Sequence, residues 1–134
     1  MRNKGNIYIY SLDLVHSMLV EFRVKNFRSL RDEQVLSLVA SKDKTLQDTH
    51  TVTTGIRAAP TVLRSAAIYG ANASGKSNLI KALQYMRGVV TESATAIQPG
   101  QLFAVQPFQL DANSAQQPSE FEVTFLIEGV RYQY

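Results

Sequence analysis

The chain has 134 residues, an apolar fraction of 45% and a formal net charge of +3 from 14 basic and 11 acidic residues. This composition suits one small folded domain and excludes a wholly disordered chain, while the charge is too small to indicate nucleic-acid binding by itself. The lack of cysteine excludes disulfides and thiol chemistry and agrees with a cytoplasmic location, and no apolar run is long enough to predict a membrane-spanning helix.

The N-terminal residues carry only a weak targeting signal. Two basic residues and a short apolar run at 7–10 faintly resemble a signal peptide, but polar residues interrupt the run and no convincing cleavage site follows. Met18 begins a sequence that reads as a complete first strand. We therefore expect residues 1–17 to be an extension that is not native, and residues 18–134 to hold the folded part.

Alternation of apolar and charged residues predicts a half-buried strand over 20–25. A polar turn over 26–32 and a second apolar run, 34–39, would complete an antiparallel hairpin. Four basic residues gather here, and they form either a solvated outer face or a contact to a nucleotide or a nucleic-acid backbone: Arg23, Lys25, Arg28 and Arg31.

The next stretch, 41–60, is long and polar, and we expect short pieces of strand near Thr51–Thr53. His50 in this stretch is interpreted as an exposed surface residue. No second histidine, cysteine or acidic cluster stands at a metal-ligand spacing from it. His16 is a weaker candidate still.

Residues 70–77 have the spacing of a P-loop, or Walker A motif, in which two glycines are separated by four residues and followed by Lys and Ser. The loop reads Gly70, Ala71, Asn72, Ala73, Ser74, Gly75, Lys76 and Ser77. Backbone N–H groups of such a loop cradle phosphate oxygens, Lys76 would reach the β- and γ-phosphates, and the Ser77 hydroxyl would ligate Mg²⁺.

The residues on either side supply the context that this motif requires. The apolar run 65–69 predicts a buried parallel strand before the loop. After the loop, helical spacing predicts an amphipathic helix whose apolar side carries Leu79, Leu83, Met86 and Val90. Strand, glycine loop and helix together favour a phosphate site over a Gly/Ser-rich turn that merely joins two elements.

The last third of the chain predicts mostly strands. Residues 102–110 are expected to form a strand that Pro107 places at an edge or interrupts. A loop follows over 111–119, and the cleanest alternation in the chain then predicts a strand over 120–128. A tight turn at Glu128-Gly129 would lead into a final hairpin strand.

Two of these stretches resemble a known family. Residues 19–30, LVEFRVKNFRSL, resemble the first strand and turn of ABC/SMC-like ATPase heads, including RecF-like and AAA-family proteins. Residues 68–79, IYGANASGKSNL, are similar to the P-loop of the same group, with Asn72 and Asn78 at matching positions. Many members have Gly where this chain has Ala73, which points to bacterial and archaeal AAA-family ATPases, several of which belong to phage-defence or toxin-like systems.

The resemblance implies an α/β P-loop NTPase fold, specifically the N-terminal lobe of an ABC/SMC-like head with an antiparallel β group beside the nucleotide. It implies ATP and Mg²⁺ as ligands, bound by 70–77 together with Asn78, with Ser77 on the metal. In complete members, two heads dimerise around ATP, and hydrolysis drives their separation. The implied partners are therefore a second head and, beyond that, a nucleic acid or a defence-system effector, with no membrane.

Part of the hydrolytic machinery is not recognisable. ATP hydrolysis in this class needs an apolar strand that ends in Asp, followed by a Glu that positions water, and no such segment follows the loop. Asp32-Glu33 follows a polar turn instead, and the family's signature motif and switch histidine are also missing. Gln106 or Gln109 is either a ligand of Mg²⁺ and water or a surface residue. No catalytic residue is assigned, and we expect residues 18–134 to be the N-terminal part of a longer ATPase.

Other functions remain open at this point. The chain is alternatively a nucleotide-binding module that does not hydrolyse ATP, or a truncated remnant. A GTPase would need an Asn-Lys-x-Asp segment, which residues 3–6 do not supply, and a P-loop kinase would need an Arg-rich lid that is not recognisable.

Overall fold

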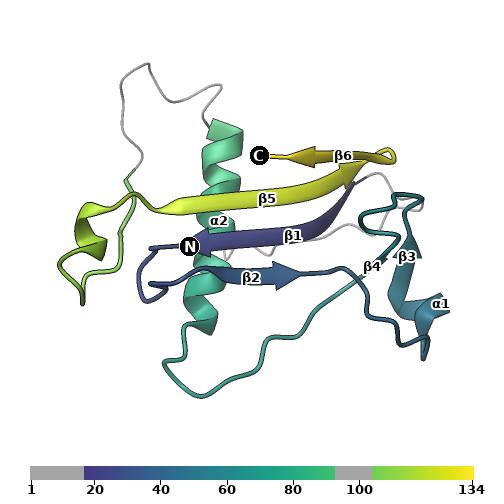
Figure 1. Cartoon of the computed structure of the whole chain (residues 1–134), viewed down its shortest axis with the longest axis horizontal. Helices are drawn as coiled ribbons and strands as arrows, with labels where there is room; N and C mark the ends of the chain where they lie inside the picture. The colour runs from purple at the N-terminus through teal and green to yellow at the C-terminus, as the bar shows by residue number, and fades with distance from the viewer. Residues whose placement is uncertain (1–16, 93–103) are drawn as a thin grey trace, which may run out of the picture.

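The computed structural model describes residues 17–92 and 104–134 (Figure 1). The main sheet is antiparallel with the order β2-β1-β5-β6, formed by β1 (Ser17–Lys25), β2 (Gln34–Ser37), β5 (Glu120–Ile127) and β6 (Val130–Gln133). A smaller sheet pairs β3 (Thr51–Thr53) with β4 (Thr61–Leu63). The helical segments of the described residues are α1 (Gln47–His50), α2 (Lys76–Glu92) and the 3₁₀ turn η1 (Ser114–Gln116).

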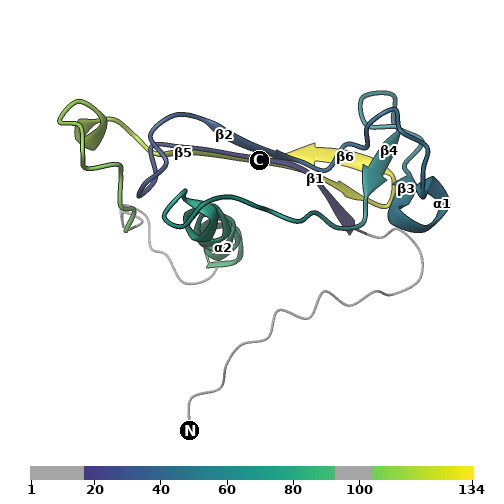
Figure 2. The ribbon, with the colours of Figure 1, turned by 90° about the horizontal axis from the view of Figure 1, so that it is seen from below.

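The helix α2 lies across one face of the main sheet, as Figure 2 shows most clearly. Every second residue of β1 faces it, so Phe22 and Val24 are buried against Ala82 and Met86. Phe22 is fully buried, with 0% of its surface exposed. This contact fixes the position of the helix that begins directly after the glycine loop.

A β-bulge in β1 lets the same strand contribute to a second apolar cluster. The pairing of β1 with β5 shifts register between Leu19 and Glu21, so that Val20 is the extra residue. Val20 then packs with Val62 of β4 and Leu126 of β5, whereas Leu19 packs with the first cluster. The smaller sheet is therefore attached to the main one through apolar contacts of its own.

Both predicted hairpins are confirmed. β1 and β2 pair antiparallel, although β2 ends at Ser37 rather than continuing through 39. β5 and β6 also pair antiparallel, and Glu128 and Gly129 between them both have positive φ, at 50° and 77°. Two positive φ values match the twist of a tight hairpin turn, which is the reason for the glycine. The short strand expected near residues 51–53 is β3.

The predicted parallel strand at 65–69 is wrong for this structure. The segment is extended but belongs to no strand, and its residues are exposed, with Tyr69 at 90%. A buried parallel strand needs neighbours on both sides, and none of the strands in the described ranges pairs with this one. The segment is apolar, as a buried strand would be, but an apolar sequence does not by itself provide a neighbouring strand to pair with.

Two further expectations need correction. The described part of 102–110 forms no strand, consistent with the interruption that Pro107 imposes; residues 102 and 103 lie outside the described ranges. The helix α2 forms as predicted, but Val90 is exposed near its C-terminal end. The buried side of α2 instead contains Ala82 and Met86, with Leu79 and Leu83 half-buried beside them.

The prediction of an N-terminal extension over residues 1–17 falls almost entirely outside the described ranges. Ser17 already pairs with Ile127 as the first residue of β1, and residues 1–16, including His16, lie outside the described ranges. Among the residues that the structure describes, no helix has both the length and the hydrophobicity that a membrane crossing would demand.

Candidate functional site

The glycine loop turns sharply and runs straight into α2. The N–H of Ser74 bonds to the carbonyl of Ala71 at 3.3 Å, and the helix then begins at Lys76. Gly75 has a φ of +92°, a conformation that costs a glycine little. A Cβ on Gly70 would lie 2.8 Å from Ser74 Oγ, so both glycines are placed where a side chain would strain or crowd the loop.

Ala73 also adopts a left-handed conformation, with a φ of 63°. For a residue with a Cβ this costs roughly 1 kcal/mol or more relative to the right-handed region. The strain lies at the position where many members of the resembled family have glycine. The loop therefore adopts the left-handed conformation at residue 73 although the Cβ of Ala73 makes that conformation unfavourable.

The side chain of Lys76 folds back over the loop. Its Nζ donates hydrogen bonds to the carbonyl oxygens of Gly70 at 2.6 Å and Ala71 at 2.5 Å, and lies 3.4 Å from Ser74 Oγ. No carboxylate pairs with it within the described residues. The loop thus surrounds one unpaired positive charge, which is the chemistry that a polyphosphate requires.

Two residues of the first turn of α2 complete the site. Ser77 is exposed, and its hydroxyl has no hydrogen-bond partner among the described residues, so it is free to bind a cation. The 17 residues of α2 also place the positive end of the helix dipole beneath the loop. Asn78 has a different role, because its side-chain amide points at a neighbouring turn.

This turn, at residues 27–30, supports the loop from one side. Asn78 Nδ2 donates a hydrogen bond of 2.7 Å to Ser29 Oγ. A Cβ built on Gly75 would lie 3.0 Å from Leu30 Cδ2, so the backbone of the loop rests directly on the turn. The sequence placed Asn78 at the site but did not reveal Ser29, whose only signal was its place in the Asn-Phe-Arg-Ser turn.

The turn is itself fixed by Asn26, which is 3% exposed. Its amide nitrogen, whose two N–H groups must share one bond between two acceptors, donates to the carbonyls of Ser114 at 2.8 Å, Gln117 at 2.8 Å and Pro118 at 3.2 Å. Its Oδ1 accepts a bond of 3.0 Å from the N–H of Phe108. Asn26 thereby ties the turn to the loop before β5.

We expect Ser29→Ala to weaken binding of a nucleotide by the glycine loop about threefold to tenfold, the effect of one lost hydrogen bond. The reason is that Asn78 would lose the contact that positions the first turn of α2. Isothermal titration of Ser29→Ala, Asn78→Ala and the double variant would measure this as a double-mutant cycle. If the two single effects simply add, the Ser29–Asn78 contact does not position the loop.

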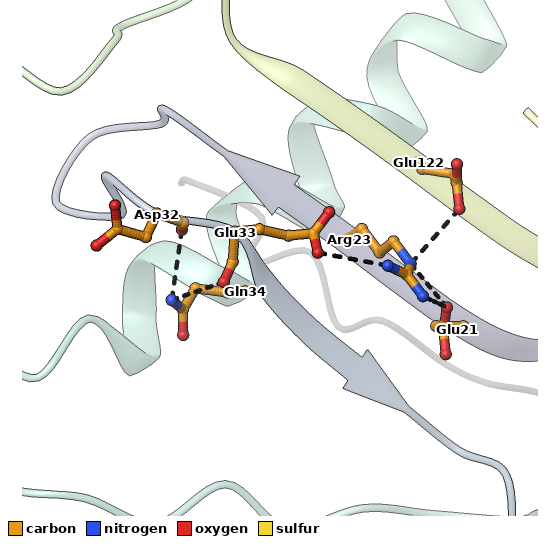
Figure 3. Close-up of polar contacts among 6 residues, drawn as sticks. All are labelled: Glu21, Arg23, Asp32, Glu33, Gln34 and Glu122. Carbon is orange, nitrogen blue, oxygen red and sulfur yellow. Dashed lines mark hydrogen bonds and ion pairs between the residues drawn. The ribbon is translucent and has the colours of Figure 1, made fainter. Parts of the chain in front are cut away.

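Three of the four basic residues of the first hairpin are neutralised by acids. Figure 3 shows Arg23 among Glu21, Glu33 and Glu122, at N–O distances of 2.7, 3.4 and 3.6 Å. The hydrogen bond to Glu21, helped by its charge, raises the pKa of Arg23 above its ordinary value. This cluster is a solvated face of paired charges rather than a surface for an anion.

The other two pairs have the same character. Lys25 bonds Glu120 at 2.9 Å, and Arg31 bonds Asp32 at 3.2 Å. In both cases the hydrogen bond to the carboxylate raises the pKa of the cation. Arg28 alone of the four has no acidic partner in the described ranges, and its guanidinium lies over the ring of Phe27, 5.5 Å from the centroid.

In the part of the chain that the structure describes, no hydrogen bond or ion pair joins the remaining candidates to the glycine loop. His50 is exposed at the end of α1, where its Nδ1 lies 2.7 Å from Thr49 Oγ1. Gln106 and Gln109 are both exposed, and Gln106 uses its backbone carbonyl to accept the N–H of Arg28 at 2.8 Å. No group of three or more His, Cys, Asp or Glu residues that could hold a metal occurs in the described part of the chain.

The glycine loop opens a long helix that packs on a β-sheet, which are two of the three parts of a P-loop unit; the strand before the loop does not form in the described residues. The chain belongs to the family described as "AAA domain, putative AbiEii toxin, Type IV TA system", whose model matches residues 65–134, slightly more than half of the chain. It is therefore a P-loop, AAA-type ATPase-like domain. No curated protein and no solved structure gives a significant match to it.

Proposed function

We propose that this chain binds ATP together with Mg²⁺ through residues 70–78. The observation that carries the proposal is the position of Lys76, whose ammonium lies inside the loop and is held by the carbonyls of Gly70 and Ala71. These bonds are to neutral acceptors that also face water. Phosphate oxygens are stronger, charged acceptors for the same ammonium, so a triphosphate would draw it away.

The residues at the loop could supply only part of the coordination shell of a magnesium ion. Mg²⁺ keeps several waters and takes oxygen ligands from one or two protein groups and from substrate phosphates. The Ser77 hydroxyl is the oxygen ligand that we assign to the ion, and the rest of the coordination would come from phosphate and water. When bound, the ion would neutralise part of the charge on the β- and γ-phosphates.

We further propose that the chain is the N-terminal part of an ABC/SMC-like ATPase, with residues 18–134 as the domain portion and 1–17 as an extension. Hydrolysis would belong to the complete protein, in which two heads close around ATP in the cytoplasm. The family description names a putative toxin of a type IV toxin–antitoxin system. A defence-system effector is accordingly the partner that we propose for the complete ATPase.

A second candidate is a nucleotide-binding module without hydrolytic activity. It is favoured by one observation: the acidic residues nearest in sequence to the hairpin turn, Asp32 and Glu33, are engaged with Arg31 and Arg23. Both carboxylates are thus directed at neighbouring arginines, and no hydrogen bond or ion pair joins either of them to the glycine loop within the described residues. Measuring phosphate release from the complete protein separates the two candidates, because turnover that Lys76→Ala abolishes would exclude the binding-only function.

Titration with magnesium-ATP, followed through backbone amide resonances, tests the proposal directly. We expect the amides of residues 70–78 to shift, and ADP to act similarly, because the loop is built to hold the β-phosphate. AMP lacks this group and is expected to bind far more weakly. GTP, which has the same triphosphate as ATP but a different base, serves as the control for recognition of adenine.

Two results would contradict ATP binding at this loop. One is a folded sample whose 70–78 amides do not move at millimolar magnesium-ATP. The other is equal binding of AMP and ATP, which would show that the loop does not read the phosphate chain.

A further inference from the structure

The strand β6 leaves one edge of the main sheet open. It is the last strand in the order β2-β1-β5-β6, and within the described ranges no strand pairs with its outer side (Figure 1). The opposite edge differs, because the chain after β2 runs into the smaller sheet, where the N–H of Ala40 donates to the carbonyl of Thr61 at 2.9 Å. β6 contains no proline, lysine or bulge, which are the features that commonly protect an edge strand from pairing.

The ladder between β5 and β6 decides which backbone groups of β6 face outwards. Tyr134 exchanges two hydrogen bonds of 3.0 Å with Val123, and pairs that exchange bonds alternate along an antiparallel ladder with pairs that do not. Every second residue of β6, counted back from Tyr134, therefore directs its N–H and C=O at β5. Arg131 and Gln133 alternate with these residues and direct their N–H and C=O away from the sheet, where no described strand receives them.

The same alternation gives β6 an apolar side. Tyr132 pairs with Phe125 of β5, and the two rings stack with their centroids 5.6 Å apart. Val130 and Tyr134 lie on the same face as Tyr132, and all three are between 46% and 59% exposed. This is the face on which α2 packs, because Val123, opposite Tyr134, packs against the cluster that includes α2. A strand added at this edge would bury part of this apolar surface as well as the outward backbone groups.

Charge and backbone pairing select a second copy of β6 in one register. A two-fold axis at Arg131 would set two guanidinium groups opposite each other, which is destabilising. An axis at Gln133 would use the outward groups of only that residue within β6. An axis at Tyr132 uses the outward groups of both Arg131 and Gln133, and it sets each arginine opposite the partner's Gln133, a neutral acceptor.

We propose that two copies of this chain pair through β6, antiparallel about a two-fold axis at Tyr132, and so form one continuous sheet. The two Tyr132 side chains then face each other as a non-hydrogen-bonded pair, the closer kind, in which aromatic contacts stabilise a sheet. An edge that pairs with itself closes after two copies. The interface lies at the edge opposite the β1–β2 hairpin, whose turn supports the glycine loop. It needs no nucleotide, so it differs from a dimer closed around ATP and does not rest on the proposed ATP binding.

Sedimentation velocity from micromolar to millimolar protein tests the proposal through opposite charge changes at one position. Gln133→Glu places a carboxylate opposite the partner's Arg131 in both symmetric pairs, so we expect it to tighten the dimer about threefold or more. Gln133→Lys sets two cations opposite each other, and we expect it to weaken the dimer by a similar factor. Ser37→Glu and Ser37→Lys, at an exposed position of the other edge strand, are the matched controls and should each change the dimer by less than about twofold.

A backbone variant tests the same interface without a change in charge. Gln133→Pro removes an N–H that faces outwards and keeps the bonds between β5 and β6, since proline is tolerated at such an edge position. We expect it to abolish the dimer, with a melting temperature close to that of the wild type at micromolar concentration.

Four results would overturn the proposal. The first is a wild-type chain that stays monomeric up to millimolar concentration. The second is a shift of the same sign for Gln133→Glu and Gln133→Lys, which would contradict the register. The third is association that continues beyond two copies. The fourth is a dimer that requires magnesium-ATP and is lost in Lys76→Ala, which would place the contact around the nucleotide. A dimer that persists in Lys76→Ala without nucleotide supports pairing through β6, whether or not the glycine loop binds ATP.

Discussion

Lys76→Ala is expected to weaken magnesium-ATP binding roughly 30- to 150-fold, or about 2 to 3 kcal/mol, the contribution of hydrogen bonds to a charged group. The ammonium lies within the loop, with no carboxylate partner among the described residues to compete with the phosphates. Stability without nucleotide is expected to fall by less than about 1 kcal/mol, because the carbonyls of Gly70 and Ala71 are exposed and can bond to water instead.

Isothermal titration and thermal unfolding without ligand give the two quantities separately. Arg87→Ala is the matched control, since it removes one positive charge from an exposed position of the same helix. Its affinity for ATP is expected to stay within twofold of the wild-type value. A Lys76→Ala variant that loses stability and affinity in parallel would assign the lysine a structural role rather than a role in holding phosphate.

Asn26→Ala is expected to lower the free energy of unfolding by about 2 to 4 kcal/mol. The change removes four hydrogen bonds of a buried side chain and leaves three carbonyls and one N–H without their partner. It also puts alanine at a φ of 54°, where a Cβ is unfavourable. Urea unfolding followed by circular dichroism would measure the loss.

Two companion variants separate these causes. Asn26→Gly removes the same hydrogen bonds but tolerates the positive φ, so it should be less destabilising than alanine by roughly 1 kcal/mol. Asn113→Ala, at an exposed position in the loop that Asn26 ties down, should be nearly neutral. If Asn26→Ala is as stable as Asn113→Ala, the turn does not depend on this side chain.

The elements that the sequence predicted correctly are those in which one local pattern decides the structure. Strict alternation located β1 and β5, and the Glu128-Gly129 pair located the turn between β5 and β6. The glycine loop and the start of α2 followed from a motif whose spacing is rigid. In each case the residues that determine the element lie within a few positions of one another.

The failures occurred where the outcome depends on distant neighbours. The apolar run at 65–69 reads as a buried strand, but burial requires flanking strands that no local pattern reveals. Val90 fits the helical period but lies beyond the part of α2 that the sheet covers. Ser29 and Asn26 are polar turn residues by sequence, and their roles arise from contacts with Asn78 and with residues more than eighty positions away.

The pairing of β1 with β5 also constrains when the fold can be completed during synthesis. β1 leaves the ribosome first, yet Ser17 pairs with Ile127, so the strand at the centre of the sheet waits for almost the whole length of the described chain. Such long-range pairing slows folding, because the intervening segment must be closed into a loop first. The helix α2, which carries Lys76, is thus synthesised before the sheet on which it packs is complete. Until β5 has emerged from the ribosome, the apolar side of α2 would be exposed to chaperones.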